Sequence, residues 1–259
     1  MRFPIFLSIR DKATRLPGKS FVDVAGQPAV EQLIARLKGA YRASGIIICT
    51  SVHPDDAVFE PVAARHGLGC FRGSEDDKLE RYRAAAEQVG AEFIVVVDGD
   101  DLLCDPGQID RIIAAYEAST ATDAPLDYII VDELPVGVTG FGVRVEALER
   151  VCEIKKESDT EVWGGYFANS GLFNCAFLQP DNELTRRPDL RLTLDYPEDL
   201  AVFRAVFENF RDRSFDLDDV VSYLDDNPKV SAINAEVQQK YLAHLAEAAP
   251  VRLADGETA

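Results

Sequence analysis

Short apolar runs rich in β-branched residues alternate along this chain with segments of helical periodicity. We predict strands at 3–9, 46–50, 93–97 and 128–131, and helices at 28–42, 54–65, 77–89 and from 106 onward. Uninterrupted apolar strands are typical of parallel strands buried on both faces, because each connecting helix covers one face of the sheet. The sequence therefore predicts an α/β fold of three layers, α/β/α, with a mostly parallel central sheet.

The middle of the chain is less regular. Residues 134–190 carry scattered glycines and aromatics, which predicts either an inserted lobe facing the substrate or an irregular edge of the sheet. Strand-like alternation returns at Leu192–Asp195, ahead of a helix from Pro197 to about Phe210 and two further helices. We therefore expect one domain over residues 1–248, followed by a loose tail over residues 249–259.

Acidic residues outnumber basic ones in this chain of 259 residues, 45 Asp and Glu against 27 Lys and Arg. The resulting net charge of -18 repels phosphate backbones, which excludes general nucleic-acid binding. No apolar run approaches the length of a bilayer span, and the first residues lack a signal-peptide pattern. Five scattered cysteines without a C-x-x-C pair are typical of thiols in a reducing compartment. We therefore expect a cytoplasmic protein with neither a nucleic-acid nor a membrane partner.

A basic loop follows the first predicted strand. Four cations, Arg10, Lys12, Arg15 and Lys19, fall within ten positions of an otherwise acidic chain. Open α/β sheets bind ligands beyond the carboxyl ends of their strands, so this loop is placed to bind a polyanion, with Arg10 and Lys19 neutralising phosphate charge. A solvated basic turn is the alternative. A P-loop is disfavoured because Ala13 stands where its first glycine is required.

Acidic residues follow two of the apolar runs. Asp98, Asp100 and Asp101 come directly after the strand predicted at 93–97, and Asp195 follows Leu192–Leu194. If both runs are buried strands of one sheet, Asp100 and Asp195 converge at one rim and suit Mg²⁺, which takes one or two carboxylates together with waters and phosphate oxygens. Each could instead cap a helix or turn, Asp195 the helix that begins at Pro197.

The stretch 71–82 allows two interpretations. Ser74 or Asp77 can cap the helix that follows. Alternatively, Gly73 and Ser74 lie against a nucleobase, with Lys78 or Arg81 directed into the site. The spacing of these residues leaves both interpretations open.

The residues from Arg10 to Lys19 resemble the R-x-x-S-x-R-L-P-G-K signature of CTP-dependent sugar-activating cytidylyltransferases. These include the 3-deoxy-manno-octulosonate, acylneuraminate and spore-coat polysaccharide enzymes. Three further segments are similar to the spore-coat branch in the same order, 71–82, 191–200 and 233–240. The chain departs from the family at Ala13, where serine is usual, and in the middle, where Gly137–Phe141 and Glu161–Gly164 replace family motifs.

This resemblance implies a nucleotide-diphospho-sugar transferase fold of the GT-A type, a homodimer and a Mg²⁺ cofactor. It implies transfer of CMP from CTP to an acidic sugar or a related small acid, with release of pyrophosphate and with 134–190 on the acceptor side. Arg10 and Lys19 would be catalytic through the triphosphate, and Asp100 and Asp195 would bind the metal. The nucleotide-binding residues implied are Leu7, Ser8, Ile9, Arg10, Arg15, Lys19, Ser74, Arg81 and Asp98.

Two other functions fit part of the pattern. Asp98-Gly99-Asp100 is a D-x-D motif, with which GT-A glycosyltransferases hold a metal and a sugar nucleotide. The altered middle region would also suit a non-catalytic nucleotide-binding paralogue. The stretch from Arg15 to Lys19 favours a triphosphate substrate over the first alternative, and the intact candidate site residues count against the second.

Overall fold

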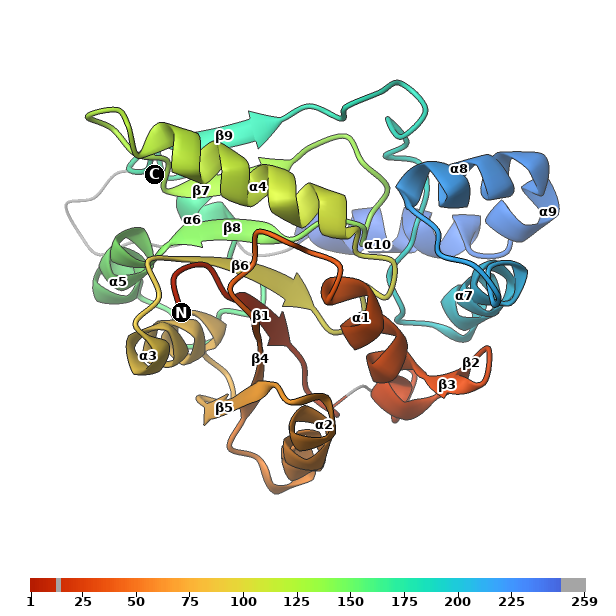
Figure 1. The fold of residues 1–259 in the computed structure, drawn as a ribbon, viewed down its shortest axis with the longest axis horizontal. Coiled ribbons are helices and arrows are strands. Elements are labelled where there is room, and N and C mark those ends of the chain that lie inside the picture. Colours follow the sequence, from red (N-terminus) through yellow and green to blue (C-terminus); the bar gives the residue numbers. More distant parts are fainter. Residues whose placement is uncertain (13–14, 248–259) are drawn as a thin grey trace.

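A computed structural model describes residues 1–12 and 15–247 of the chain (Figure 1). The tail expected at 249–259 and the departure at Ala13 lie outside the described residues. A seven-stranded sheet forms the centre, with β8 antiparallel to both neighbours and the other strands parallel to one another. Its spatial order is β5 (Gly69–Gly73), β4 (Ile46–Ser51), β1 (Ile5–Ser8), β6 (Phe93–Asp98), β8 (Phe141–Arg144), β7 (Tyr128–Val131) and β9 (Cys175–Leu178). The expected mostly parallel sheet is confirmed.

Helices cover both faces of this sheet. They are α1 (Ala29–Leu37), α2 (Phe59–His66), α3 (Lys78–Val89), α4 (Pro106–Ser119), α5 (Val145–Ile154), α6 (Gly165–Ala168), α7 (Pro197–Asn209), α8 (Leu217–Asp226), α9 (Pro228–Ser231) and α10 (Ala235–Glu247). Short 3₁₀ turns, η1 (Lys19–Phe21) and η2 (Pro54–Val58), and a small hairpin of β2 (Asp23–Val24) and β3 (Gln27–Pro28) complete the described elements. None of these helices combines the length and apolar character that a bilayer span requires.

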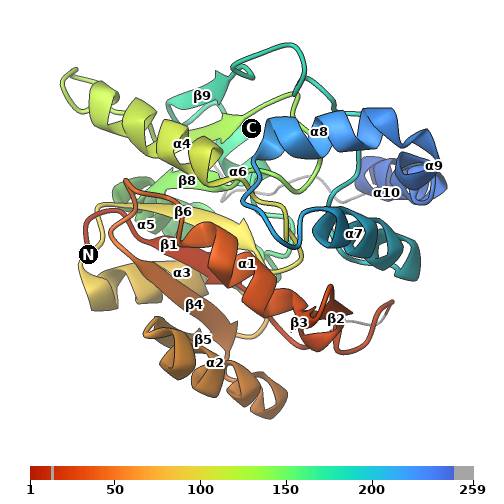
Figure 2. The ribbon, with the colours of Figure 1, turned by 45° about the vertical axis from the view of Figure 1, so that its right-hand side comes forward.

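The three layers follow from the alternation of side chains along the strands. Ile5 and Leu7 of β1 belong to a core shared with α1, α2, α4, α7 and α8, whereas Phe6 belongs to a second core shared with α3, α5 and α6. Successive residues of a strand point to opposite faces, so a fully apolar strand needs a helical layer on each side. Figures 1 and 2 show α1 and α4 on one face and α3 and α5 behind the other. The predicted three-layer α/β/α architecture is therefore confirmed.

The irregular middle region joins the main sheet. Its strand β8 inserts between β6 and β7, and β9 forms one edge. The strand signal of β8 is weak because the packing requires glycine: a Cβ at Gly142 would lie 2.4 Å from Ile112 of α4 and 2.5 Å from Phe93 of β6. Sequence periodicity cannot report this close approach, which explains why no strand was predicted there.

The stretch Leu192–Asp195 is not a strand, contrary to expectation. Only one isolated bridge, between Val136 and Arg191, is found there. The N–H of Leu192 donates to the Val136 carbonyl at 2.7 Å, and that of Leu194 donates to the Asp100 carbonyl at 2.9 Å. The alternation of apolar residues reflects two buried leucines, while the backbone bonds two different segments and so forms no ladder. Asp195 is nevertheless tied to the loop that carries Asp100.

A buried ion pair fixes this part of the chain. The side chains of Arg191 and Asp199 are both 0% exposed, and the Arg191 Nε donates to Asp199 Oδ1 at 2.9 Å. The same carboxylate accepts the backbone N–H groups of Asp195 and Tyr196, both at 3.0 Å, and the side-chain amide of Asn234 at 2.9 Å. Because the Asp199 carboxylate accepts all these hydrogen bonds, it fixes the first residues of α7, and with them Asp195, in one position.

We expect Asp199→Ala to lower the free energy of unfolding by about 3–5 kcal/mol, because it leaves the Arg191 guanidinium buried without its main counter-ion. Asp212→Ala, which removes an exposed carboxylate just beyond α7, is the matched control and should change stability by less than about 0.5 kcal/mol. Urea denaturation followed by circular dichroism measures both. A loss for Asp199→Ala no larger than that of the control would contradict this role.

Candidate active site

A cleft of about 590 Å³ opens beyond the carboxyl ends of β1 and β6. Its walls come from the basic loop after β1, the acidic loop after β6, the segment before α6, Asp195 and Tyr241 of α10. Of the residues predicted from the sequence, those that line it are Ser8, Ile9, Arg10, Arg15, Lys19, Asp98, Asp100 and Asp195. The tertiary structure thus gathers most of the predicted set in one place.

Lys19 joins the two predicted metal ligands. Its Nζ lies 2.8 Å from Asp100 Oδ2 and 2.8 Å from Asp195 Oδ1. Gly18, at φ 67°, precedes it in a left-handed conformation that turns the loop into η1. The second oxygen of Asp195 receives Arg191 Nη2 at 2.8 Å. Lys19, Asp100 and Asp195 therefore form one compact charged group at the base of the cleft.

The two carboxylates of this group differ electrostatically. Burial raises the pKa of Asp100; Lys19 opposes this rise and the charges of Asp98 and Asp195 add to it, so the pKa stays above its usual value. Burial also disfavours the charge on Asp195, but Lys19 and Arg191 outweigh it, so the pKa of that carboxyl is lowered. In Lys19, burial is outweighed by both carboxylates and the pKa of the ammonium is raised. The cleft base thus holds a cation firmly.

The donor set fits a divalent cation that a ligand helps to coordinate. Asp100 and Asp195 both reach one nitrogen atom, so both can reach one cation at that place. No group of three or more His, Cys, Asp or Glu side chains gathers at metal-binding distance among the described residues. Mg²⁺ accepts one or two protein carboxylates when waters and phosphate oxygens fill the remaining positions. These residues therefore suit a metal that is shared with a phosphate-bearing ligand.

Asp195 does not cap α7, which corrects the alternative drawn from its sequence position. Tyr196 occupies the N-cap position, and the backbone N–H groups of both Asp195 and Tyr196 are accepted by Asp199. The Asp195 side chain is thereby left to face the cleft. In the region of 71–82 the capping interpretation is confirmed: Asp77 Oδ1 accepts the Glu80 N–H at 3.1 Å at the start of α3.

A second charged group lies on the opposite wall. Arg10 donates to the Glu75 carbonyl at 2.7 Å and to Glu161 Oε2 at 2.6 Å. Lys78, whose side chain is only 10% exposed, lies 3.0 Å from Glu161 Oε1 and 3.4 Å from Asp98 Oδ1. Sequence reasoning did not single out Glu161 as a site residue. One sequence signal could have pointed to it: Glu161 lies in the stretch 161–164, where this chain differs from the motif of the spore-coat branch.

Three predicted nucleotide-binding residues do not line the cleft. Leu7 is fully buried in the core, and Ser74 Oγ accepts the Asp77 N–H at 3.1 Å. Arg81 is also fully buried, and its Nη1 donates to the Ser74 carbonyl at 2.7 Å. A long cation on α3 can reach either the cleft or the loop behind it, and here it reaches the loop. Arg81 therefore supports the 74–75 backbone that Arg10 also contacts.

The D-x-D motif is divided between the two charged groups. Asp98 faces Lys78, whereas Asp100 faces Lys19. Between them a Cβ at Gly99 would lie 2.5 Å from Ile9 Cγ1, so only glycine fits this close approach of the two loops. The motif therefore does not present both carboxylates to one cation in this chain.

The cleft thus brings a cationic loop and two carboxylates, Asp100 and Asp195, together beyond the carboxyl ends of the strands, where open α/β sheets bind their ligands. The chain belongs to the cytidylyltransferase family, whose profile matches residues 7–174. It is therefore a nucleotidyltransferase, and the resemblance seen in its sequence is confirmed. The glycosyltransferase and the non-catalytic interpretations are not supported.

Individual relatives cover nearly the whole chain. The spore coat polysaccharide biosynthesis protein SpsF of Bacillus subtilis is 27% identical over 230 residues, which are 86% of this chain and 93% of SpsF. A cytidylyltransferase structure from Leptospira borgpetersenii matches with a TM-score of 0.79 at 22% identity, over 89% of this chain and 97% of that one. These matches support the expected nucleotidyltransferase fold.

Two more distant structures were solved with ligands. CMP:2-keto-3-deoxy-manno-octonic acid synthetase in complex with CTP matches with a TM-score of 0.61 at 14% identity, over 81% of this chain and 99% of that one. Rv0371c of Mycobacterium tuberculosis in complex with manganese matches with a TM-score of 0.53 at 18% identity, over 76% of this chain and 94% of that one. Both share the fold of this protein.

Proposed function

We propose that this cytidylyltransferase transfers CMP from CTP to a hydroxyl of an acidic sugar or a related small acid, with Mg²⁺ and with release of pyrophosphate. The arrangement that carries the proposal is Lys19 held between Asp100 and Asp195 beneath the basic loop. Such a group offers a cation for a polyphosphate and two hard oxygen ligands for its metal. The fold relative solved with CTP and the one solved with manganese support the same ligand classes.

In this mechanism Arg10 and Lys19 bind the triphosphate and are the catalytic cations. They offset charge that builds on the α-phosphate and on the leaving pyrophosphate as the acceptor oxygen attacks. Ser8, Ile9, Arg15 and Asp98 line the cleft beside them and hold the nucleotide. Ser74 and Arg81 do not touch the nucleotide in this proposal; they hold the backbone of residues 74–75, to which Arg81 donates hydrogen bonds. Leu7 contributes by anchoring the end of β1 in the core.

Asp100 and Asp195 hold Mg²⁺ in this proposal. When bound, Mg²⁺ would supply positive charge that stabilises the phosphate oxygens of the leaving group. The Lys19 ammonium lies between these carboxylates in the structure, so Lys19 exchanges their contact for the phosphates as substrate binds. Asp100 and Asp195 would then pair with the bound Mg²⁺ in place of Lys19.

The opposite wall undergoes a similar exchange. Arg10 and Lys78 are paired with Glu161, whose side chain is 54% exposed. This carboxylate occupies the cations that an anionic substrate needs, so it competes with substrate for them. Glu161 comes from the 134–190 region, and with Asp159 and Val162 of the same segment it lines the cleft. That placement supports assigning 134–190 to the acceptor side.

The wider setting is part of the proposal. All five cysteines are free thiols, which suits a reducing cytoplasm. The resemblance to homodimeric sugar-activating enzymes supports a homodimer, to be checked by light scattering.

We expect CTP with Mg²⁺ to raise the melting temperature of the protein more than ATP, GTP or UTP with Mg²⁺, because a ligand that binds only the folded state stabilises it.

When CTP is supplied together with acidic sugars and small phosphonates, tested one at a time, pyrophosphate should be released only with the compound that serves as the acceptor. Lys19→Ala should abolish the release while the circular dichroism spectrum is retained. Greater stabilisation by another nucleotide would overturn the base assignment, and normal turnover in Lys19→Ala would remove Lys19 from catalysis.

The shared metal predicts a particular mutational pattern. Asp100→Asn and Asp195→Asn should each raise the Mg²⁺ concentration needed for half-maximal activity. The double variant should cost far less than the product of the single effects, because both residues serve one site. Asp76→Asn, which removes another carboxylate from the cleft wall, is the matched control and should leave the Mg²⁺ requirement unchanged. A silent Asp195→Asn would refute the shared site.

Competition by Glu161 predicts a gain of affinity. Glu161→Gln should bind CTP about two- to five-fold more tightly, since a partly exposed ion pair contributes less than about 1 kcal/mol. Isothermal titration calorimetry without acceptor measures the dissociation constant. Glu157→Gln, a substitution in the same segment outside the cleft lining, should leave it unchanged. Weaker CTP binding by Glu161→Gln would show that the carboxylate assists the nucleotide instead of competing with it.

A further inference from the structure

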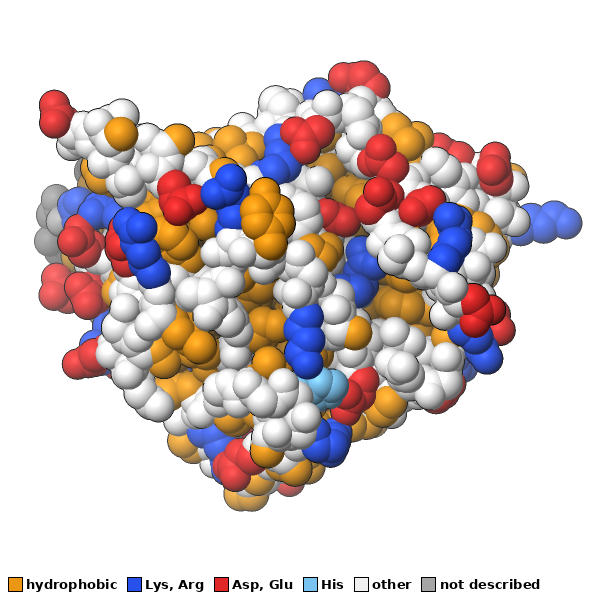
Figure 3. Space-filling model, viewed as in Figure 1, with side chains coloured by type: hydrophobic (Ala, Val, Ile, Leu, Met, Phe, Trp, Pro, Cys, Tyr) orange, Lys and Arg blue, Asp and Glu red, His pale blue; other side chains and the backbone are white. Residues whose placement is uncertain are grey.

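A second cavity, here called the rear pocket, lies away from the active cleft. It has a volume of about 430 Å³ and is enclosed by α1, the β2–β3 hairpin, Pro106 of α4, the end of α7 and residues 211–215. It shares no lining residue with the cleft among the described parts of the chain. Figure 3 shows the hollow between α1 and α7, with apolar and basic side chains inside it.

The charged side chains that line the rear pocket are all basic. Three arginines line it, Arg36, Arg211 and Arg213, and none of the described lining residues is Asp or Glu. The active cleft, in contrast, is lined by both signs, and the whole chain has a net charge of -18. The carboxylates that partner these arginines lie just outside the lining, so the only charged side chains that the cavity itself presents to a ligand are basic. Such a surface favours anions over cations.

Arg36 is the buried member of this set. Its side chain is 9% exposed, and its two hydrogen bonds, to the carbonyls of Cys104 and Phe215, are long at 3.4 and 3.3 Å. Its Nη2 is buried without a hydrogen-bond acceptor and lies 3.7 Å from Asp105 Oδ2. A buried guanidinium is costly when its donors are incompletely satisfied, so this one is a ready partner for an incoming anion.

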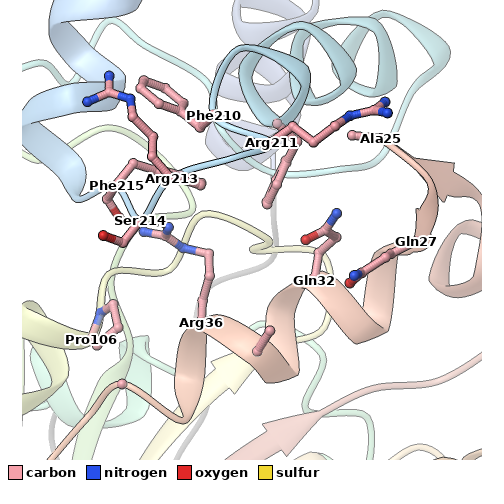
Figure 4. Close-up of a pocket in the computed structure, with 13 residues that line it drawn as sticks. Ala25, Gln27, Gln32, Arg36, Pro106, Phe210, Arg211, Arg213, Ser214 and Phe215 are labelled. Atoms are coloured by element: carbon pink, nitrogen blue, oxygen red, sulfur yellow. Dashed lines mark hydrogen bonds between the residues drawn. The ribbon is translucent and has the colours of Figure 1, made fainter.

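The two outer arginines form ion pairs at the surface, and Arg213 also lies 4.6 Å from the centre of the Phe210 ring. Arg213 lies 3.4 Å from Asp219, with 58% and 35% of the side chains exposed, and Arg211 pairs with Glu208 one turn back on α7. Exposed pairs of this kind contribute little and exchange readily for a stronger anion. Figure 4 shows Gln32 and Arg36 projecting from α1 toward the segment that carries Arg211, Ser214 and Phe215, with the guanidinium groups of Arg211 and Arg213 extending to opposite sides.

The rest of the pocket is flat and apolar. Phe210 and Phe215 stack with ring centroids 4.6 Å apart, and the Arg36 guanidinium lies 4.4 Å above the Phe215 ring. Phe207, Ala25, Ala35 and Pro106 add further apolar surface. Ligand sites combine such a surface with a few polar groups, here the guanidinium groups and the amides of Gln27 and Gln32.

We propose that the rear pocket is a binding site for a small organic anion, a phosphate or carboxylate carried on a flat apolar body. The arginines bind the anionic group through charge-assisted hydrogen bonds, and the aromatic floor binds the body. The site is distinct from the active cleft, because the two share no lining residue among the described parts of the chain.

Phenyl phosphate, benzoate, phenol and inorganic phosphate are the probes, titrated by calorimetry into the protein with saturating CTP and Mg²⁺ present. The first two should bind, and their relative affinity assigns phosphate or carboxylate as the preferred group. Phenol lacks the phosphate or carboxylate group and inorganic phosphate lacks the flat apolar body, so each should bind at least tenfold more weakly. Failure of both phenyl phosphate and benzoate to bind would overturn the proposal.

Arg211→Ala/Arg213→Ala tests the location. Both residues are exposed, so the fold should be retained, and the affinity for the better probe should fall at least tenfold. Arg42→Ala/Arg65→Ala removes two exposed arginines elsewhere and should leave the affinity unchanged. Three results would each refute the rear pocket as the site. They are an unchanged affinity for the probe in the Arg211→Ala/Arg213→Ala protein, an equal loss of affinity in the control protein, and displacement of the probe by increasing CTP.

Discussion

The buried pair of Arg191 and Asp199 is the constraint on which the active cleft depends. Asp199 accepts the N–H groups that begin α7, which releases the Asp195 side chain from capping and leaves it facing Lys19. Arg191 contacts the other oxygen of Asp195 and lies 5.1 Å from the ring of Tyr241. One desolvated ion pair thus sets the helix start, the orientation of a proposed metal ligand and one wall of the cleft. Such a pair is retained here for position, since buried ion pairs add little net stability.

The charged side chains of the cleft are paired with side chains of opposite charge. On one wall Lys19 is held by Asp100 and Asp195, and on the other Arg10 and Lys78 are held by Glu161. An acidic protein can keep a buried cationic site in the absence of substrate only if carboxylates balance it. In the proposed function, substrate replaces these partners. A triphosphate with its metal would suit this cleft because it brings both an anion for the cations and a cation for the carboxylates.

The rear pocket is balanced less completely. Its arginines have carboxylate partners just outside the described lining, but Arg36, packed against the Phe215 ring, keeps one buried nitrogen without a hydrogen-bond acceptor. The two cavities therefore differ in degree. The cleft pairs its charges closely, whereas the rear pocket leaves a buried donor that an anionic ligand would satisfy.

Much of the fold was predictable because burial on both faces of a parallel strand leaves a direct mark on the sequence. Continuous apolar runs predicted β1, β4, β6 and β7, and the basic loop and Asp100 were located from their position after such runs. The sequence by itself determined the layers, the residue types of the site and the family. Tertiary structure alone decided the rest. Gly142 fits β8 beneath α4 through a contact that no periodicity encodes, and Asp195 reaches Lys19 without ending a strand. Arg81 turns to the 74–75 backbone because α3 packs against the sheet, and Glu161 meets Arg10 across 151 positions. Local sequence sets what a segment can form, but the direction of a charged side chain depends on partners that only the folded chain brings together.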